Sequence, residues 1–155
     1  MPFNNKTISL RKTISFLAVL VLLGCSSAEL KTSSPVPSIT LYSGLETYHF
    51  PISTSHSEAQ RYFDQGLVLA FGFNHLEAVR SFQEAYRLDP KCALCYWGEA
   101  LVLGPNINAP MNPAVNPQAI SALEQAVALA KSVSDKEQAL ISALAKRYSK
   151  LSAMD

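Results

Sequence analysis

Along residues 58–71 the apolar side chains recur every three to four positions, with polar residues between them. This period is typical of an amphipathic α-helix that buries one face. The predicted buried face consists of Tyr62, Phe63, Gly66, Leu67 and Ala70. Ser57 stands just before the stripe, where its hydroxyl can accept a hydrogen bond from the first helical turn, so we predict that it is the N-cap.

A second helix is predicted over residues 75–88. It follows a break at residues 72–74, in which Asn74 can cap the new helix, and it ends at Asp89 because the proline that follows disfavours helical geometry there. The side chains predicted to face inward are Leu76, Val79, Phe82, Ala85 and Tyr86. The two helices and the short break between them predict a helix-turn-helix hairpin.

Further along the chain the sequence predicts a second, less regular helix hairpin. A loop over residues 104–116 separates a predicted helix over 93–103 from a helix that opens with Pro117, a residue favoured in a first turn. A last helix is expected after Ser134, whose spacing to Glu137 predicts a capping box.

Tyr62 recurs as Tyr96 after 34 residues, and at the same offset Gly66 is replaced by Ala100. A helix hairpin that repeats at this period resembles the tetratricopeptide repeat family. Six signature positions of that family are occupied at the expected spacing, by Tyr62, Gly66, Ala78, Phe82, Ala85 and Pro90. The resemblance implies an all-α fold whose hairpins stack into a short α-solenoid.

By this resemblance, repeat 1 spans 58–90, repeat 2 spans 93–131, and residues 135–150 are the first helix of an incomplete third repeat. Such arrays usually need about three repeats for stability. We therefore expect the chain to be the N-terminal part of a longer protein. The stretches similar to longer bacterial secreted tetratricopeptide proteins are 89–98 and 104–108.

Residues 1–24 have the composition of a secretory signal peptide, with three basic residues before the ten apolar residues ISFLAVLVLL. A membrane-spanning helix would need about 20 apolar residues. The stretch Leu22-Leu23-Gly24-Cys25 resembles the lipobox of bacterial lipoproteins, which implies that Cys25 becomes an acylated N-terminus. An ordinary cleaved signal with an incidental cysteine is the alternative. The serine at position 26 implies, by the same resemblance, the outer membrane, facing the periplasm.

The mature chain is expected to have two parts. Residues 25–44 hold the acylated cysteine and a tether rich in Ser, Thr and Pro, and residues 45–155 form the helical domain. Two or three acyl chains would anchor this domain stably to a membrane.

Composition and motifs narrow the function classes. Lys plus Arg number 13 against 12 Asp plus Glu, a net charge of +1 that provides no basic field for nucleic acid. No catalytic motif such as a Ser-His-Asp order, H-E-x-x-H or a phosphate-binding loop is present, so we predict neither an enzyme nor a cofactor. The carboxylates of Glu77, Glu84 and Glu99 are interpreted as a solvated helix face.

Cys92 and Cys95 form a C-x-x-C pair at the start of a helix. In an oxidising periplasm they are expected to close into a structural disulfide. A helix N-terminus also lowers a thiol pKa, so redox exchange is an alternative. A metal site is a further alternative, with His75 as a possible third ligand; covalent haem would need a histidine after Cys95, where Tyr96 stands.

In the tetratricopeptide family the first helix of each hairpin lines a concave groove. That register implies that Phe63, Leu67, Phe71, Trp97 and Leu101 point into the groove, as partner contacts or as core. Asn106 and Asn108 in the long loop are candidate contacts at the groove rim, or caps of helix ends.

We therefore predict a membrane-anchored module of the bacterial cell envelope that binds a protein or peptide partner on this concave surface. A periplasmic redox or metal-binding protein that uses Cys92 and Cys95 is the alternative. A structural subunit that links an envelope complex is a third possibility.

Overall fold

The computed structural model describes residues 39–151, with side chains as far as Tyr148. The predictions for the signal peptide at 1–24, the lipidated Cys25 and the tether before residue 39 lie outside the described residues. Within residues 39–151 the chain is all-α, with five α-helices, two short 3-10 helices and no strand. None of these helices is long and apolar enough to cross a membrane.

The first hairpin consists of α1, Ser57–Phe71, and α2, His75–Leu88. The N-cap of α1 is His56, whose Nδ1 accepts from the amide of Ala59 at 3.4 Å, so the prediction of Ser57 is wrong by one residue. In the turn, Phe73 takes the left-handed conformation with φ 60°. The amide of Asn74 donates to the carbonyl of Leu69 at 2.8 Å, but the Asn74 side chain makes no cap hydrogen bond. The turn is thus closed by backbone geometry.

The second hairpin consists of α3, Ala93–Leu103, and α4, Asn116–Leu129, followed by α5, Asp135–Leu151. The 3-10 helices, Pro113–Val115 and Ala130–Ser132, lie just before and just after α4.

A capping box at the start of α5 is confirmed. The amide of Ser134 donates to Glu137 Oε2 at 2.9 Å, and the amide of Glu137 donates to Ser134 Oγ at 3.4 Å. Glu137 also accepts from the amide of Ser53 at 2.8 Å, and from its hydroxyl. This carboxylate therefore fixes both the start of α5 and a residue that precedes α1.

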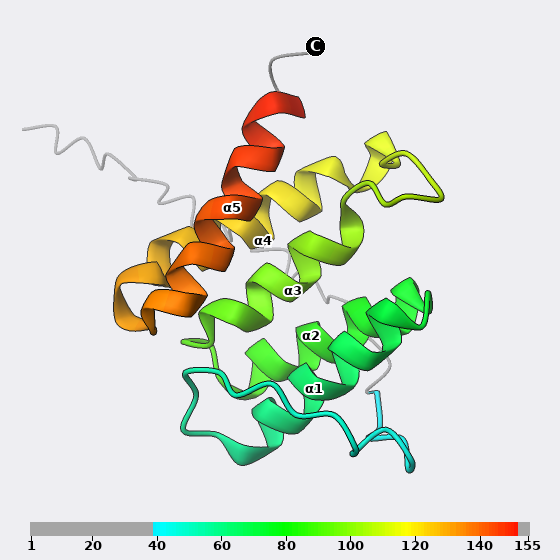
Figure 1. Ribbon diagram of the computed structural model, residues 1–155, viewed down its shortest axis with the longest axis vertical. Helices are drawn as coiled ribbons and strands as arrows, with labels where there is room; N and C mark the ends of the chain where they lie inside the picture. The colour runs from blue at the N-terminus through cyan, green and yellow to red at the C-terminus, as the bar shows by residue number, and fades with distance from the viewer. Residues whose placement is uncertain (1–38, 152–155) are drawn as a thin grey trace, which may run out of the picture. The chain divides into compact units, whose positions relative to one another are not determined.

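Each helix packs against the next one in the chain (Figure 1). In addition α1 contacts α3, and α3 contacts α5, so α3 adjoins both of the other odd-numbered helices. This arrangement brings α1, α3 and α5 together along one side of the helical body.

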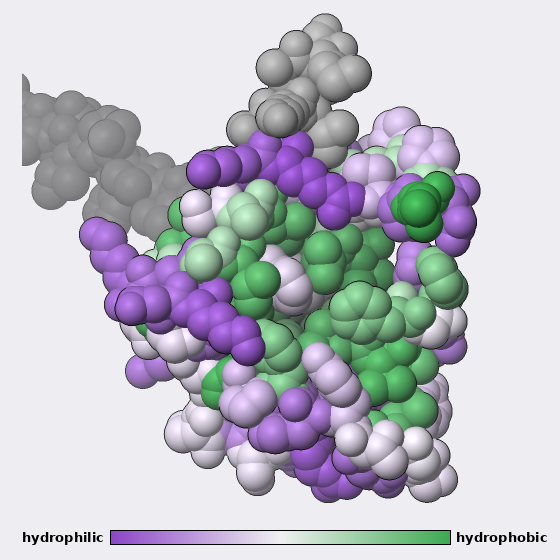
Figure 2. Space-filling view, viewed as in Figure 1, coloured by the Kyte–Doolittle hydropathy of each residue, from purple (hydrophilic) through white to green (hydrophobic). Residues whose placement is uncertain are grey.

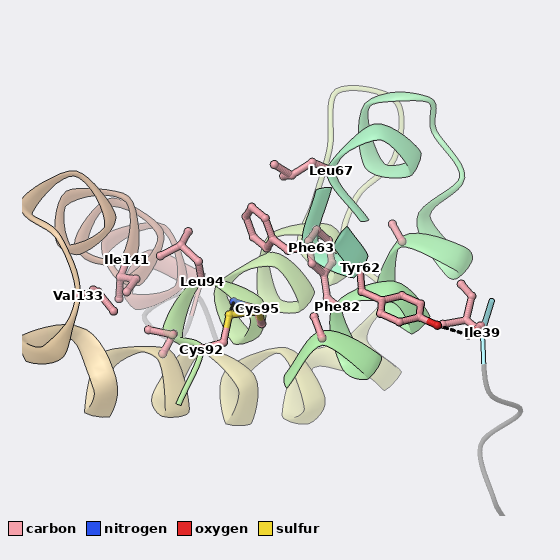
Figure 3. Packing of buried hydrophobic residues seen from close by; sticks show 14 residues of the cluster. Ile39, Tyr62, Phe63, Leu67, Phe82, Cys92, Leu94, Cys95, Val133 and Ile141 are labelled. Carbon is pink, nitrogen blue, oxygen red and sulfur yellow. Dashed lines mark hydrogen bonds between the residues drawn. A yellow bond between two sulfur atoms is a disulfide. The ribbon is translucent and has the colours of Figure 1, made fainter. Parts of the chain in front are cut away.

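Phe82 of α2 fills the space where α1, α2 and α3 meet (Figure 3). A Cβ placed on Gly66 would lie 2.7 Å from its ring, and one on Gly98 would lie 2.5 Å from it, so both helices approach the ring closely because they carry glycine there. Phe63 packs against the same ring, with centroids 5.6 Å apart. Leu76, predicted to face inward, is 65% exposed because the first turn of α2 extends past this core.

Residues 39–44 belong to the predicted tether, yet they pack against α1. Ile39 is buried, and its carbonyl accepts from the hydroxyl of Tyr62 at 3.0 Å (Figure 3). The Gln65 side chain accepts from the Tyr42 amide at 2.7 Å and donates to the Thr40 carbonyl at 3.1 Å. The structured body thus begins at least six residues before the predicted boundary at 45.

Candidate functional site

A groove of about 490 Å³ opens between α1, α3, the α3–α4 loop and α5. Figure 2 shows hydrophobic side chains gathered over α1 and α3 on this face, with hydrophilic side chains around them. The groove is lined by Leu67, Ala70, Phe71, His75, Leu101, Val102, Pro105, Asn106, Ile107 and Arg147. Its volume is in the range typical of ligand and peptide pockets.

The α3–α4 loop owes its shape to Asn106. Its amide donates to the Ala109 carbonyl at 3.0 Å, and the Ala109 amide donates back to the Asn106 carbonyl at 3.3 Å. The Asn106 Oδ1 accepts from the amides of Asn108 and Ala109, at 2.8 and 3.1 Å. This tight turn leaves Ile107 at its tip, 93% exposed.

Four of the predicted partner contacts line the groove: Leu67, Phe71, Leu101 and Asn106. Phe71 is 74% exposed, whereas Leu67 is nearly buried and lies in the floor. Asn106 acts mainly within its own loop, since its side-chain oxygen is occupied by two amides.

Three other predicted contacts are not in the lining. Phe63 is fully buried between the rings of Phe50 and Phe82, so it belongs to the core and offers no surface to a partner. Trp97 is half-buried, and its indole N–H donates to the Leu140 carbonyl of α5 at 3.1 Å. Asn108 is exposed, it is not among the residues that line the groove, and its backbone amide donates to Asn106 Oδ1 at 2.8 Å.

The sequence prediction missed Ile107 and Arg147. Ile107 could have been found as the apolar residue in an otherwise polar, Asn- and Pro-rich loop. Arg147 lies on α5, beyond the two predicted repeats, and had no local signal. It is half-buried at the groove and forms no ion pair with any residue that the structure describes.

Cys92 and Cys95 are joined by a disulfide, with their Cα atoms 5.3 Å apart (Figure 3). Cys92 is also the N-cap of α3, because its sulfur accepts from the Cys95 amide at 3.2 Å. Both residues are fully buried, which favours a structural role over exchange with a second thiol.

His75 does not join the cysteines. It starts α2, whereas Cys92 follows the end of α2, so the length of that helix, roughly 20 Å, separates them. Within the described residues no three His, Cys, Asp or Glu side chains are grouped so that they could hold a metal ion.

A smaller cavity of about 240 Å³ contains a His-Asp pair. His49 Nδ1 lies 2.8 Å from Asp64 Oδ2, and Asp64 Oδ1 also accepts from the Phe50 amide at 3.0 Å. The residues that line this cavity include no Ser, Thr or Cys. The pair holds the segment before α1 onto that helix.

Glu99, interpreted from the sequence as solvent-facing, is 3% exposed. Its Oε1 accepts from the side-chain amides of Gln83 and Gln118, both at 2.7 Å. The interpretation as a solvated face is therefore wrong for Glu99, because this residue points between α2 and α4.

No protein-family model, curated protein or solved structure matches the chain.

Proposed function

We propose that the chain is a tetratricopeptide-type module that binds a segment of another protein in the groove between α1, α3 and α5. The two hairpins, the contacts among the odd-numbered helices and the 34-residue spacing from Tyr62 to Tyr96 support this architecture. The fit of Phe82 between two helical glycines supports it further.

Two exposed side chains at a single groove carry the proposal. Phe71 at the end of α1 and Ile107 at the tip of the loop are 74% and 93% exposed, and both line the same cavity. Large apolar side chains exposed together in a concave site mark a surface for a partner. Because the helices below are packed and the loop is closed by its own hydrogen bonds, few groups need to be ordered on binding.

The occupant is an extended peptide segment with apolar side chains and a carboxylate. Leu67, Phe71 and Leu101 give the groove an apolar floor and wall, which suits leucine-like or aromatic side chains. Arg147 at the edge has no ion-pair partner among the described residues, and a carboxylate is the group that its guanidinium binds best.

Selection from a random peptide library on immobilised protein tests this proposal. Wild-type protein should enrich peptides with apolar residues and an Asp or Glu, and Arg147→Glu should enrich Lys or Arg at that place instead. Phe71→Ser and Ile107→Ser should each lower the affinity for the selected peptides roughly tenfold or more. Val127→Ser, on the exposed surface of α4, is the matched control and should leave binding unchanged. Selection of the same peptides by wild type and Arg147→Glu would contradict the proposed occupant.

We also propose that the module is anchored to the bacterial envelope by acyl chains on Cys25, and that its partner is an envelope protein. Intact mass of protein extracted from membranes, with thiol alkylation in parallel, tests this. A diacyl or triacyl mass that begins at Cys25 and lacks alkylation at Cys92 and Cys95 is the expected result. An unlipidated mature mass would refute the anchor, and free thiols with bound metal would favour the redox or metal-binding alternative.

A further inference from the structure

The most unusual charged group of the described chain is the Glu99 carboxylate, which lies between three helices. It comes from α3 and is 3% exposed. Its Oε1 accepts from Gln83 of α2 and from Gln118 of α4 at 2.7 Å each, and the Tyr86 side chain lies near enough for Glu99 to raise its pKa. All these partners are neutral.

None of the direct ion pairs among the described residues joins a cation to Glu99. The ion pairs there are Arg80–Glu77 and Arg87–Glu84, His49 lies beside Asp64, and none of these contacts includes Glu99. A buried carboxylate is normally paired with a cation or a metal, because its desolvation is costly. Neutral amide donors satisfy its hydrogen bonds but leave its charge uncompensated.

Glu99 forms part of a cavity of about 220 Å³ between α2, α3 and α4. The residues of α4 at its mouth, Gln118, Ser121 and Gln125, are exposed and polar. One wall is the stacked pair of Tyr86 and Tyr96, with ring centroids 4.3 Å apart. Burial and the nearby Glu99 raise the pKa of Tyr86 far above its usual value, so its hydroxyl stays protonated at neutral pH.

We propose that this cavity binds an alkylammonium group, which places its charge beside the Glu99 carboxylate. An ammonium is a compact cation with three N–H donors, and the residues that line the cavity include Glu99, Ser121 and Gln125, whose side chains carry acceptor oxygens. The tyrosine rings add an aromatic surface of the kind that attracts cations. The ammonium can come from a free amine or from a lysine side chain of another protein.

This site is independent of the peptide groove, because its lining shares no residue with the groove. A negative binding result at one site therefore does not contradict the proposal for the other site.

The test is a titration of the protein with n-butylammonium at constant ionic strength and neutral pH, followed by NMR of the glutamine side-chain amides. n-Butanol is the neutral counterpart. We expect saturable shifts of the Gln83 and Gln118 amide signals with the amine and none with the alcohol. In a second arm, Nα-acetyl-lysine N-methylamide replaces n-butylammonium: tighter binding of the lysine derivative assigns the site to a lysine side chain, and tighter binding of n-butylammonium assigns it to a free amine.

Variants separate the carboxylate from its surroundings. Glu99→Gln removes the charge at nearly the same side-chain volume and should lower the affinity for n-butylammonium roughly tenfold or more. Glu124→Gln removes an exposed charge from α4 outside the cavity and should leave binding unchanged. Ser121→Phe narrows the mouth from an exposed position, so it tests the cavity even if Glu99→Gln does not fold. Equal shifts with amine and alcohol, or undiminished binding by Ser121→Phe, would overturn the proposal.

Discussion

Where α2 meets α1 and α3, a single aromatic ring fills the space between two glycines, and the turn from α1 to α2 is three residues long. Where α4 meets α3 and α5, the buried contacts come from Ala100, Ala119, Ala122, Leu123, Leu144 and Tyr148, and residues 104–115 connect α3 to α4. We call these the aromatic junction and the alanine junction. In the aromatic junction the packing leaves no room for another side chain, whereas the alanine junction consists mostly of alanine and leucine side chains, with one tyrosine from α5.

The two junctions also differ in how much apolar surface remains open beside them. Beside the alanine junction lies an open, mostly apolar pocket of about 480 Å³, which is lined by residues that include Leu123, Val127 and Tyr148. The Tyr148 hydroxyl donates to the Ala100 carbonyl at 2.5 Å, and burial raises the pKa of Tyr148 to about 12. The comparison teaches that close approach of two helices to one ring closes a junction, whereas alanines bring helices together but leave their outer apolar edges open.

The largest expected effect is the loss of the central ring. Phe82→Ala should lower the free energy of unfolding by about 3–5 kcal/mol, because the cavity that it leaves is enclosed on all sides. Leu123→Ala, in the alanine junction, should cost less, because Leu123 borders an open surface that solvent can fill. Urea unfolding monitored by circular dichroism measures both, and equal costs would show that the two junctions are equally closed.

Next in size is the addition of one methyl group. In Gly98→Ala the new Cβ would lie 2.5 Å from the Phe82 ring, so we expect a loss of about 2–3 kcal/mol despite the better helix propensity of alanine. The double variant Gly98→Ala with Phe82→Leu provides the control. If the smaller leucine does not recover part of the loss, contact with the ring is not the cause.

A third effect concerns the disulfide, which lies at the edge of the aromatic junction. Replacement of Cys92 and Cys95 by alanine should cost about 2 kcal/mol, because the bridge closes a short loop in the unfolded chain. Because both residues are fully buried, reduction of wild-type protein should be slow in native buffer and fast in denaturant. Alkylation followed by mass spectrometry measures this; fast reduction of the native protein would contradict a buried structural bridge and would favour redox exchange.

The smallest effect is expected at the start of α5. Burial by itself raises the pKa of Glu137, but hydrogen bonds from Ser134 and Ser53 outweigh it and hold the pKa below the usual 4.5. The stabilisation from the carboxylate is therefore fully present above pH 4.5 and is lost as the pH falls through the folded pKa. Glu137→Gln should cost about 1 kcal/mol at pH 7 and progressively less toward pH 3. Thermal unfolding from pH 7 to pH 3 checks this, and a difference that does not depend on pH would exclude the charge as the cause.

The sequence predicted the helices well because their signals are local. The bounds of α2 and α3 agree with the structure, and so does the capping box at Ser134, since apolar period, proline stops and caps depend on neighbouring residues. Gly66 and Phe82 are also buried, as the apolar pattern of the two helices predicts.

Contacts between distant residues were not predictable in this way. Glu99 resembles any surface glutamate until α2 and α4 are placed on either side of it. The sequence places Phe63 and Phe71 on the same face of the first helix. Phe63 is nevertheless fully buried, because Phe50, which lies outside any helix, covers it, whereas Phe71 is exposed at the end of α1. Likewise, nothing local shows that Arg147 lies at the groove.

The hydrogen bond from the Trp97 indole to the Leu140 carbonyl has an optical consequence. Trp97 is the single tryptophan of the chain, so its fluorescence reports on one place, the contact of α3 with α5. Detachment of α5 would expose the indole to water and shift its emission to longer wavelength, while the far-ultraviolet signal of the remaining helices stays. Emission and ellipticity recorded in one denaturation experiment would therefore show whether the last helix separates before the rest.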